Sequence, residues 1–141
     1  MVELFVDTDI ILDFLSKREP FYKHAARLFS LAEQSSIKAY VSPIIFANLY
    51  YILCKQLGKE QAIKKLLKIK LLVSIVPVNE RIIDMALTSG FTDFEDAIQY
   101  YAARASHINY LVTRNKKDYK LSDIIIMTAE EFLQCNHNQF Q

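Results

Sequence analysis

The stretch VELFVDTDIILD, residues 2–13, decides the fold class, because it joins a short apolar run to a series of acids. Its first five residues are mostly apolar and prone to form a strand, and Asp7, Asp9 and Asp13 follow closely. Thr8 or Asp9 can cap the helix that comes next. A buried strand that ends in a carboxylate places that charge at the carboxyl edge of a sheet, where open α/β folds build their sites.

Strands and helices alternate along the remaining sequence, with only two glycines and three prolines to interrupt them. The apolar patterns predict further strands at 37–41, 72–76, 110–113 and 124–127, and helices at 21–33, 43–57, 59–70, 80–89 and 94–106, with a closing helix from 128. This alternation predicts an α/β fold with a mostly parallel sheet covered by helices on both faces.

The size of the chain, 141 residues with 52% apolar content, predicts a single globular domain over residues 1–135 and a polar tail over 136–141. A net charge of +1 neither demands nor excludes a nucleic-acid partner. The two cysteines, Cys54 and Cys135, lack the spacing of a zinc site or a disulfide framework. With no signal peptide and no membrane-spanning apolar run, we expect a soluble, cytoplasmic protein.

A second acidic cluster, residues 93–96, opens a predicted helix. Thr92 and Glu95 have the spacing of a capping box, which would explain these acids as helix-terminus residues alone. The apolar stripe that begins at Phe94 leaves Asp96 to one side. Asp96 therefore faces solvent or lines a cleft, and periodicity does not separate the two.

A third polar stretch, TRNKKD at residues 113–118, follows another apolar run. It can be a solvated turn. In a functional interpretation, Thr113 and Asn115 orient a metal-bound water or a phosphate, and Arg114 or Lys116 neutralises phosphate charge.

Carboxylates gathered from separate sheet edges repel one another, and a hard divalent cation such as Mg²⁺ relieves that repulsion. The three histidines, His24, His107 and His137, have no metal-ligand spacing. The lysines between positions 59 and 70 are typical of a solvated helix face, and can alternatively contact a phosphate backbone. No glycine-rich phosphate loop is present, which argues against a nucleotide-binding module.

Three motifs in order, the last closed by a pair of residues at 118–119, resemble those of PIN domains. Residues 5–13 (FVDTDIILD) resemble the family's opening, which is usually D-T-N followed by apolar residues. Residues 96–97 match its D-A at the start of a late helix, and residues 111–115 (LVTRN) match its strand followed by T-R-D/N. Residues 118–119 are similar to its D-F. The order and spacing fit across residues 2–133, and the likeness is closest to small bacterial VapC-like toxins.

This resemblance implies a three-layer α/β/α fold around a parallel sheet of four or five strands. It also implies cleavage of RNA phosphodiester bonds with Mg²⁺ or Mn²⁺. By that correspondence Asp7, Asp96 and Asp118 bind the metal, and the catalytic positions are Asp7, Asp96, Asn115 and Asp118. A homodimer and a cognate antitoxin are further expectations carried by the resemblance alone.

The sequence departs from the family's pattern at acidic positions. Asn48 stands where the family supplies a glutamate, and Asn115 replaces an acid found in many relatives. Asp9 stands where the family usually has asparagine. The site thus loses up to two negative charges, which Asp9, Glu95 or Asp118 could make up.

These departures leave more than one function open. The leading hypothesis is a metal-dependent ribonuclease, and the toxin of a toxin–antitoxin pair is its narrower form. The alternative is a PIN-fold module that binds RNA or protein with weakened or lost catalysis. A third reading takes Asp7 and Asp9 as the D-x-D pair of a phosphotransferase. Ile11, however, occupies the place of the small hydroxyl residue such enzymes use.

Overall fold

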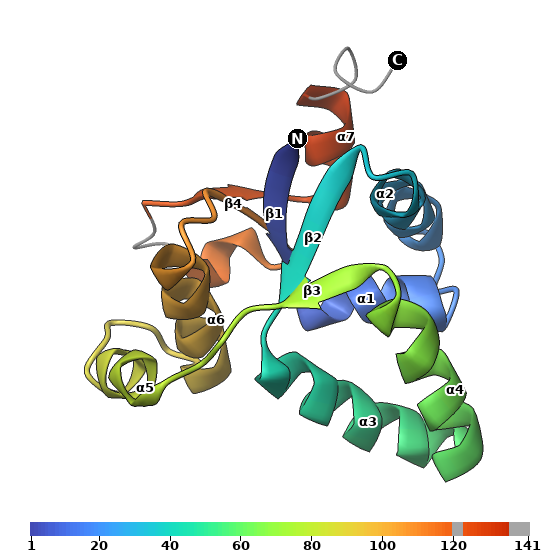
Figure 1. Cartoon of the computed structure of the whole chain (residues 1–141), viewed down its shortest axis with the longest axis horizontal. Helices are drawn as coiled ribbons and strands as arrows, with labels where there is room; N and C mark the ends of the chain where they lie inside the picture. Colours follow the sequence, from blue (N-terminus) through green and yellow to red (C-terminus); the bar gives the residue numbers. More distant parts are fainter. Residues whose placement is uncertain (120–122, 136–141) are drawn as a thin grey trace.

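The computed structural model describes residues 1–119 and 123–135, and a five-stranded sheet lies at its centre (Figure 1). The strands are β1 (Val2–Val6), β2 (Ile37–Val41), β3 (Val73–Ile75), β4 (Tyr110–Val112) and β5 (Ile125–Met127). They lie in the order β3-β2-β1-β4-β5, and every neighbouring pair is parallel. The expected α/β class and parallel sheet are confirmed.

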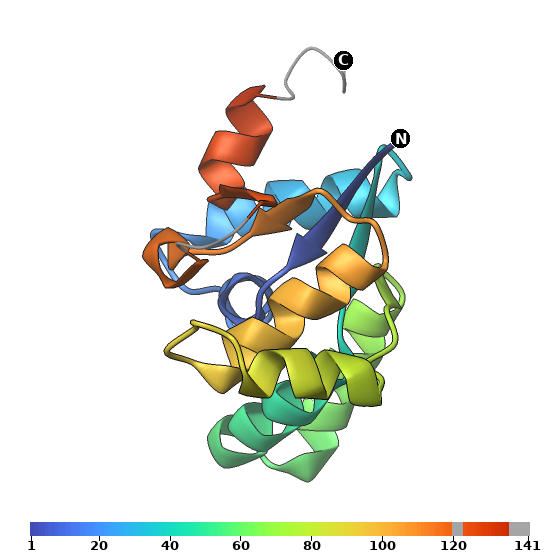
Figure 2. The same ribbon diagram turned by 90° about the vertical axis from the view of Figure 1, so that its left-hand side faces the viewer.

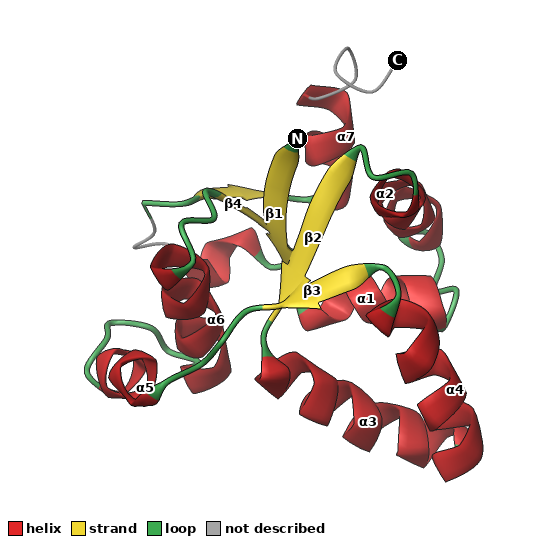
Figure 3. Cartoon of the chain, in the orientation of Figure 1, coloured by secondary structure: helices red, strands yellow, loops and turns green. Residues whose placement is uncertain are grey.

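Helices cover both faces of this sheet (Figure 3). They are α1 (Thr8–Leu15), α2 (Tyr22–Glu33), α3 (Pro43–Leu57), α4 (Lys59–Lys70), α5 (Glu80–Leu87), α6 (Phe94–Ala105) and α7 (Ala129–Cys135), with a 3₁₀ turn η1 (Lys116–Tyr119). Figure 1 shows α5 and α6 on one side and α1, α2 and α4 on the other. In Figure 2, α5 and α6 lie nearest the viewer. Within the described residues no helix is long and apolar enough to cross a membrane.

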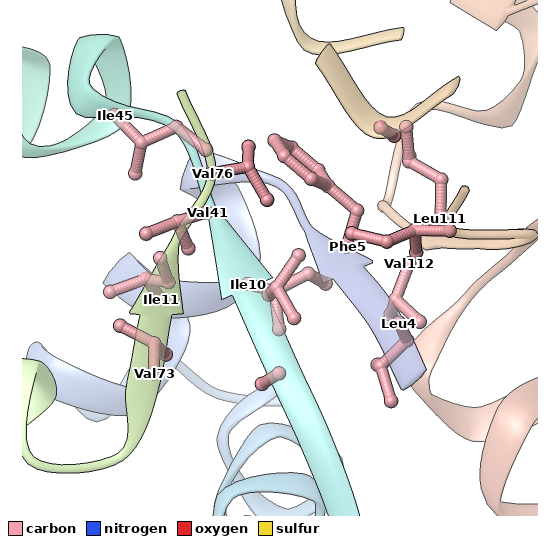
Figure 4. Packing of buried hydrophobic residues seen from close by; sticks show 14 of the residues in the cluster. Leu4, Phe5, Ile10, Ile11, Val41, Ile45, Val73, Val76, Leu111 and Val112 are labelled. Atoms are coloured by element: carbon pink, nitrogen blue, oxygen red, sulfur yellow. The ribbon is translucent and has the colours of Figure 1, made fainter. Parts of the chain in front are cut away.

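Strand β1 is the central strand, and its apolar residues are buried on both faces. Leu4, Phe5 and Val6 are fully inaccessible to solvent. Figure 4 shows Leu4 and Phe5 beside Leu111 and Val112 of β4. A continuous apolar run of this kind is typical of a parallel strand covered on both sides. Burial of apolar side chains such as these favours folding.

Most predicted boundaries agree with the structure to within two residues. Pro43 begins α3, as its fixed φ favours, and Gly58 ends it with a φ of 86°, which glycine adopts without strain. Thr128 and Glu131 form a capping box at the start of α7 through reciprocal hydrogen bonds of 2.9 and 3.1 Å. The expected polar tail, 136–141, lies outside the described residues.

The chain reverses direction across the sheet at β1. It runs outward through β2 to β3, then returns to place β4 on the other side of β1. The carboxyl ends of β1 and β4 are therefore adjacent, with Val6 opposite Val112 and the Asp7 amide donating to the Val112 carbonyl at 3.0 Å. Open parallel sheets bind ligands at such a switch point.

Candidate active site

Asp7 lies at this switch point and is only 7% exposed. Its Oδ1 accepts a hydrogen bond from the Thr8 amide, and its Oδ2 accepts one from the Thr113 hydroxyl, both at 2.8 Å. Asp7, rather than Thr8 or Asp9, is thus the N-cap of α1. Burial raises the pKa of Asp7 above its ordinary value, although hydrogen bonds from Thr113 and Thr8 lower it.

Tyr119 joins Asp7 to Asp96. The buried Tyr119 hydroxyl lies 3.3 Å from Asp7 Oδ2 and 3.3 Å from Asp96 Oδ1, so these two oxygens are at most twice that distance apart. A phenol has one proton, so it can donate to one carboxylate at a time. Two predicted site residues that are far apart in the sequence therefore meet at one hydroxyl group.

Asp96 is partly buried in the first turn of α6. Burial, followed by the negative charges of Asp7, Asp93 and Asp118, raises its pKa to about 7. The Asp96 amide donates to Asp93 Oδ1 at 3.0 Å, so Asp93 is the N-cap. The expected capping box of Thr92 is therefore wrong. The Asp118 amide donates to the Asn115 carbonyl at 3.0 Å, and its carboxylate lies near enough for its charge to act on Asp96.

The buried face of α6 is wider than the predicted apolar stripe. Phe94, expected in the stripe, is 47% exposed, whereas Gln99 and Tyr100 are buried. The Tyr100 ring packs against Phe91 at 5.2 Å between centroids. Because α6 is covered by α5 on one side and η1 on another, residues beside Asp96 are buried as well.

Asn115 and Asp9 extend the site along the edge of the sheet. The Asn115 side-chain amide donates to Asp9 Oδ2 at 3.2 Å, and its backbone amide donates to the Thr113 hydroxyl at 3.1 Å. Burial, with the charge of Asp7, raises the pKa of Asp9 to about 7. The structure therefore brings together Asp7, Asp9, Thr113 and Asn115.

Arg114 forms an ion pair with the buried Asp13. Its Nε lies 3.0 Å from Oδ2 of the fully buried Asp13, whose Oδ1 accepts from Arg18 Nε at 3.1 Å. The Arg114 guanidinium also stacks 4.0 Å above the Phe21 ring. A cavity of about 270 Å³, lined partly by Phe21, Arg114 and Asn115, lies beside the site. Arg114 therefore shapes this wall of the site.

Lys116, the other candidate for neutralising phosphate, is likewise paired. Its ammonium group lies 3.0 and 2.9 Å from the two carboxylate oxygens of Glu131. Both cations would have to exchange these partners to contact a phosphate.

The other side of Asp7 is occupied by polar residues of α6 and α3. Gln99 is fully buried, donates to Glu95 Oε1 at 3.3 Å and also lowers the pKa of Asp7. Burial raises the pKa of Glu95, and the side chains of Asn48 and Thr8 oppose that rise. Asn48, the predicted substituted position, therefore faces Glu95.

Sequence reasoning missed Tyr119 and Gln99 as site residues. Tyr119 stood in a motif whose usual residue is phenylalanine, which has no hydroxyl group. Glu95 and Gln99 are four residues apart, and this spacing on a helix was an available signal for their pairing.

The residues fit a hard divalent cation. Asp7, which is buried, and Asp96, which is partly buried, would supply oxygen ligands at a negatively charged position that lacks an adjacent unpaired cation among the described residues. Across 1–119 and 123–135, no three histidine, cysteine or acidic side chains are grouped to hold a metal as they stand. Mg²⁺ commonly uses one or two carboxylates and keeps several waters, so two acids suffice.

Comparison with known protein families gives one match, to the PIN domain, over residues 3–117. No curated protein sequence matches the chain.

Solved structures with a similar fold include proteins from three bacteria. A chain of VapBC2 from Rickettsia felis, bound to a promoter DNA fragment, is 22% identical with a TM-score of 0.67, covering 89% of this chain and 97% of that one. VapC20 of Mycobacterium tuberculosis, a Sarcin-Ricin loop cleaving toxin, is 18% identical with a TM-score of 0.62, covering 77% and 86%. A toxin–antitoxin complex from Klebsiella pneumoniae is 21% identical with a TM-score of 0.62, covering 82% and 89%. At these identities the likeness establishes a shared fold alone.

Proposed function

The chain belongs to the PIN domain family, and on that premise we propose that it is a Mg²⁺- or Mn²⁺-dependent ribonuclease. The observation that carries the proposal is the meeting of Asp7 and Asp96 at the Tyr119 hydroxyl, 3.3 Å from each. Two carboxylates this close and this buried repel each other unless a proton or a cation lies between them. Burial of Asp96, followed by this repulsion, raises its pKa to about 7 in the metal-free protein.

In this proposal Asp7 and Asp96 hold the cation, with Asp118 as a further acid beside Asp96. When bound, such a cation would supply an activated water near neutral pH and would stabilise the leaving oxygen of a phosphodiester. Thr113 holds Asp7 in place through its 2.8 Å hydrogen bond. Asn115 would orient a water or a phosphate oxygen once it releases Asp9.

RNA cleavage in Mn²⁺ tests this function. The wild type should cleave a mixed RNA pool, and Asp7→Asn should lose at least about 99% of that activity, since removing a catalytic group typically costs two or more orders of magnitude. Asp84→Asn, an exposed change on α5, is the matched control and should remain active. Cleavage that survives Asp7→Asn would refute the assignment.

A binding module with weakened catalysis is the second candidate. It is favoured by Asn48 and Asn115 and by the lack of a three-ligand group within the described segments. A Mn²⁺ titration separates the two. Micromolar binding that Asp7→Asn abolishes favours the enzyme. Binding of RNA without metal, unaffected by Asp7→Asn, favours the module.

The D-x-D phosphotransferase is disfavoured by the local packing. Ile11, at the position where a hydroxyl residue is needed, is fully buried. Fluoroberyllate forms a stable analogue of aspartyl phosphate in such enzymes. If this protein does not bind fluoroberyllate, the phosphotransferase candidate is excluded.

We further propose a toxin role in the cytoplasm, with a homodimeric protein and a cognate antitoxin as partner. The support is the fold shared with the toxin–antitoxin complex from Klebsiella pneumoniae. Expression should arrest growth, and co-expression of the neighbouring open reading frame should relieve the arrest. Healthy growth with an active enzyme would contradict the toxin role while leaving the nuclease in place.

A further inference from the structure

The cavity of about 270 Å³ beside the site lies at the same edge of the sheet as Asp7. Its lining comes from segments that follow strand ends, with α1 after β1, Asn115 after β4 and Thr128 after β5. Asn115 belongs to both places, because it lines the cavity and its side-chain amide donates to Asp9 Oδ2 at 3.2 Å. The cavity is therefore next to the position where the proposed function holds a phosphodiester.

The charges around this cavity are already paired, so it does not suit a phosphate group. Among the described residues that line it, Arg114 is the only lysine or arginine, and its Nε lies 3.0 Å from Oδ2 of the buried Asp13. Glu130 adds a negative charge, 3.8 Å from Nε2 of His24. A phosphate in the cavity would add negative charge without gaining an unpaired cation. A neutral ligand that can form hydrogen bonds fits this lining better.

Phe21 and Arg114 give the cavity a wall of two planar groups. The Phe21 side chain is 40% exposed, and the Arg114 guanidinium lies 4.0 Å from the centre of its ring. The ion pair with Asp13 holds Arg114 from the interior. Unstacked RNA bases pack against aromatic rings and guanidinium planes. This wall therefore has the chemistry that binds a base by stacking.

The size and the remaining lining of the cavity agree with a single base. Its volume lies just below the roughly 300–1,000 Å³ that is typical of pockets for drug-sized ligands, so it suits a smaller ligand. The lining also contains side chains that can hydrogen-bond to the edge of a base, namely His24, Asn115, Thr128 and Glu130. Proteins that recognise single-stranded RNA combine stacking with such edge contacts.

We propose that this cavity binds one unstacked base of a single-stranded RNA, next to the phosphodiester held at Asp7 and Asp96, with Phe21 as the stacking residue. Arg114 is then a positioning residue, which braces the ring of Phe21 through its own contact with Asp13. This inference rests on the proposed function, since it takes RNA as the ligand.

Fluorescence anisotropy with a labelled RNA tests the base site. The RNA is the best-bound sequence of about eight nucleotides from a random pool, and the parent protein is full-length Asp7→Asn, so that the RNA stays intact. Adding Phe21→Leu, which keeps an apolar side chain without a ring, should weaken binding by at least about fivefold. Phe21→Tyr should restore most of that affinity. Tyr51→Leu, at a ring that is 61% exposed on α3, is the matched control and should stay within about twofold of the parent.

An abasic nucleotide, placed at each position of the RNA in turn, shows whether Phe21 acts through a base. At one position the parent protein should lose at least about fivefold in affinity, and Phe21→Leu should show no further loss there, because the side chain and the base share one contact. A purely structural role of Phe21 would give losses that add. Circular dichroism reports folding, and His24→Ala, at another wall of the cavity, takes the place of Phe21→Leu if that variant folds poorly.

The outcomes separate this inference from the proposed function, because cleavage in Mn²⁺ is measured on the wild type. Additive losses, or equal losses in Phe21→Leu and Tyr51→Leu, overturn the base site and leave the nuclease proposal standing if the wild type cleaves RNA. No RNA binding by the parent protein also overturns the base site. Shared losses at one abasic position in a protein that does not cleave RNA support the base site and overturn the nuclease.

Discussion

Replacement of Asp96 by asparagine should stabilise the metal-free protein at alkaline pH, although it removes a proposed metal ligand. The pKa of Asp96 rises from the ordinary 3.8 to about 7, mainly because the carboxyl group is buried beside other acids. Three pKa units correspond to about 4 kcal/mol at about 1.4 kcal/mol per unit. Because Asp96 is partly exposed, solvent screening reduces this to about 2 kcal/mol.

The direction of the pH dependence follows from proton binding. Between pH 3.8 and about 7 the folded protein keeps the Asp96 proton, whereas the unfolded chain has released it. The unfolded state then binds fewer protons, so the free energy of unfolding falls as the pH rises through this range. The asparagine variant cannot ionise there and does not share this loss.

Urea unfolding in EDTA at pH 4.5 and pH 8.5 measures the effect. The advantage of Asp96→Asn over the wild type should be about 2 kcal/mol larger at pH 8.5 than at pH 4.5, or a further rise in Tm of roughly 6–8 °C. Asp84→Asn should show no such dependence. A variant that is less stable at pH 8.5, or equally favoured at both pH values, would refute the reasoning.

Added metal should reverse the order of stability. Mn²⁺ at about a hundred times its Kd should stabilise the wild type by about 2.7 kcal/mol. The Asp96→Asn variant should gain little, and the same unfolding experiment with Mn²⁺ in place of EDTA measures the difference. An equal gain in both proteins would exclude Asp96 as a ligand.

Three further changes test the surroundings of the site. Arg114→Ala should lower the free energy of unfolding by about 2–4 kcal/mol, because it leaves a buried aspartate with one partner fewer; the exposed change Arg81→Ala should cost under about 0.5 kcal/mol in the same urea titration. Asn115→Asp should strengthen Mn²⁺ binding, measured by calorimetry, and should destabilise the metal-free protein at pH 8 by about 1 kcal/mol, measured by urea unfolding, because it places a second carboxylate against Asp9. Weaker Mn²⁺ binding would contradict this. Phe5→Ala should cost about 3–5 kcal/mol, whereas Phe94→Ala, at a side chain that is 47% exposed, should cost far less, and similar losses would refute the assigned core.

The strands and helices were predictable because their patterns are local. The sequence itself shows a continuous apolar run at β1, a proline at the start of α3 and a glycine at its end. In the structure the run is buried on both faces and the glycine has a positive φ. The helix N-caps at Asp7 and Asp93 were misplaced by one or two residues, since several neighbouring side chains can cap the same turn.

The polar interior of the site was less predictable, because it depends on contacts between distant residues. The hydroxyl of Tyr119 contacts an acid 112 residues earlier, and no local pattern carries that information. Gln99 is buried because α6 is covered on more than one side, whereas periodicity assumes a single buried face. The meeting of Asp7 and Asp96 was expected from motif order, and the structure supplies the contact.

The position of β1 between β2 and β4 has a consequence for translation. Strand β2 follows β1 early in the nascent chain, but β4 is synthesised only after β3 and helices α3 to α6. Until then one edge of an apolar strand stays unpaired, which invites aggregation and a need for chaperones. The same delay keeps Asp7 apart from Thr113 and Tyr119, so a growing polypeptide cannot complete its acidic site before β4 and η1 have been made.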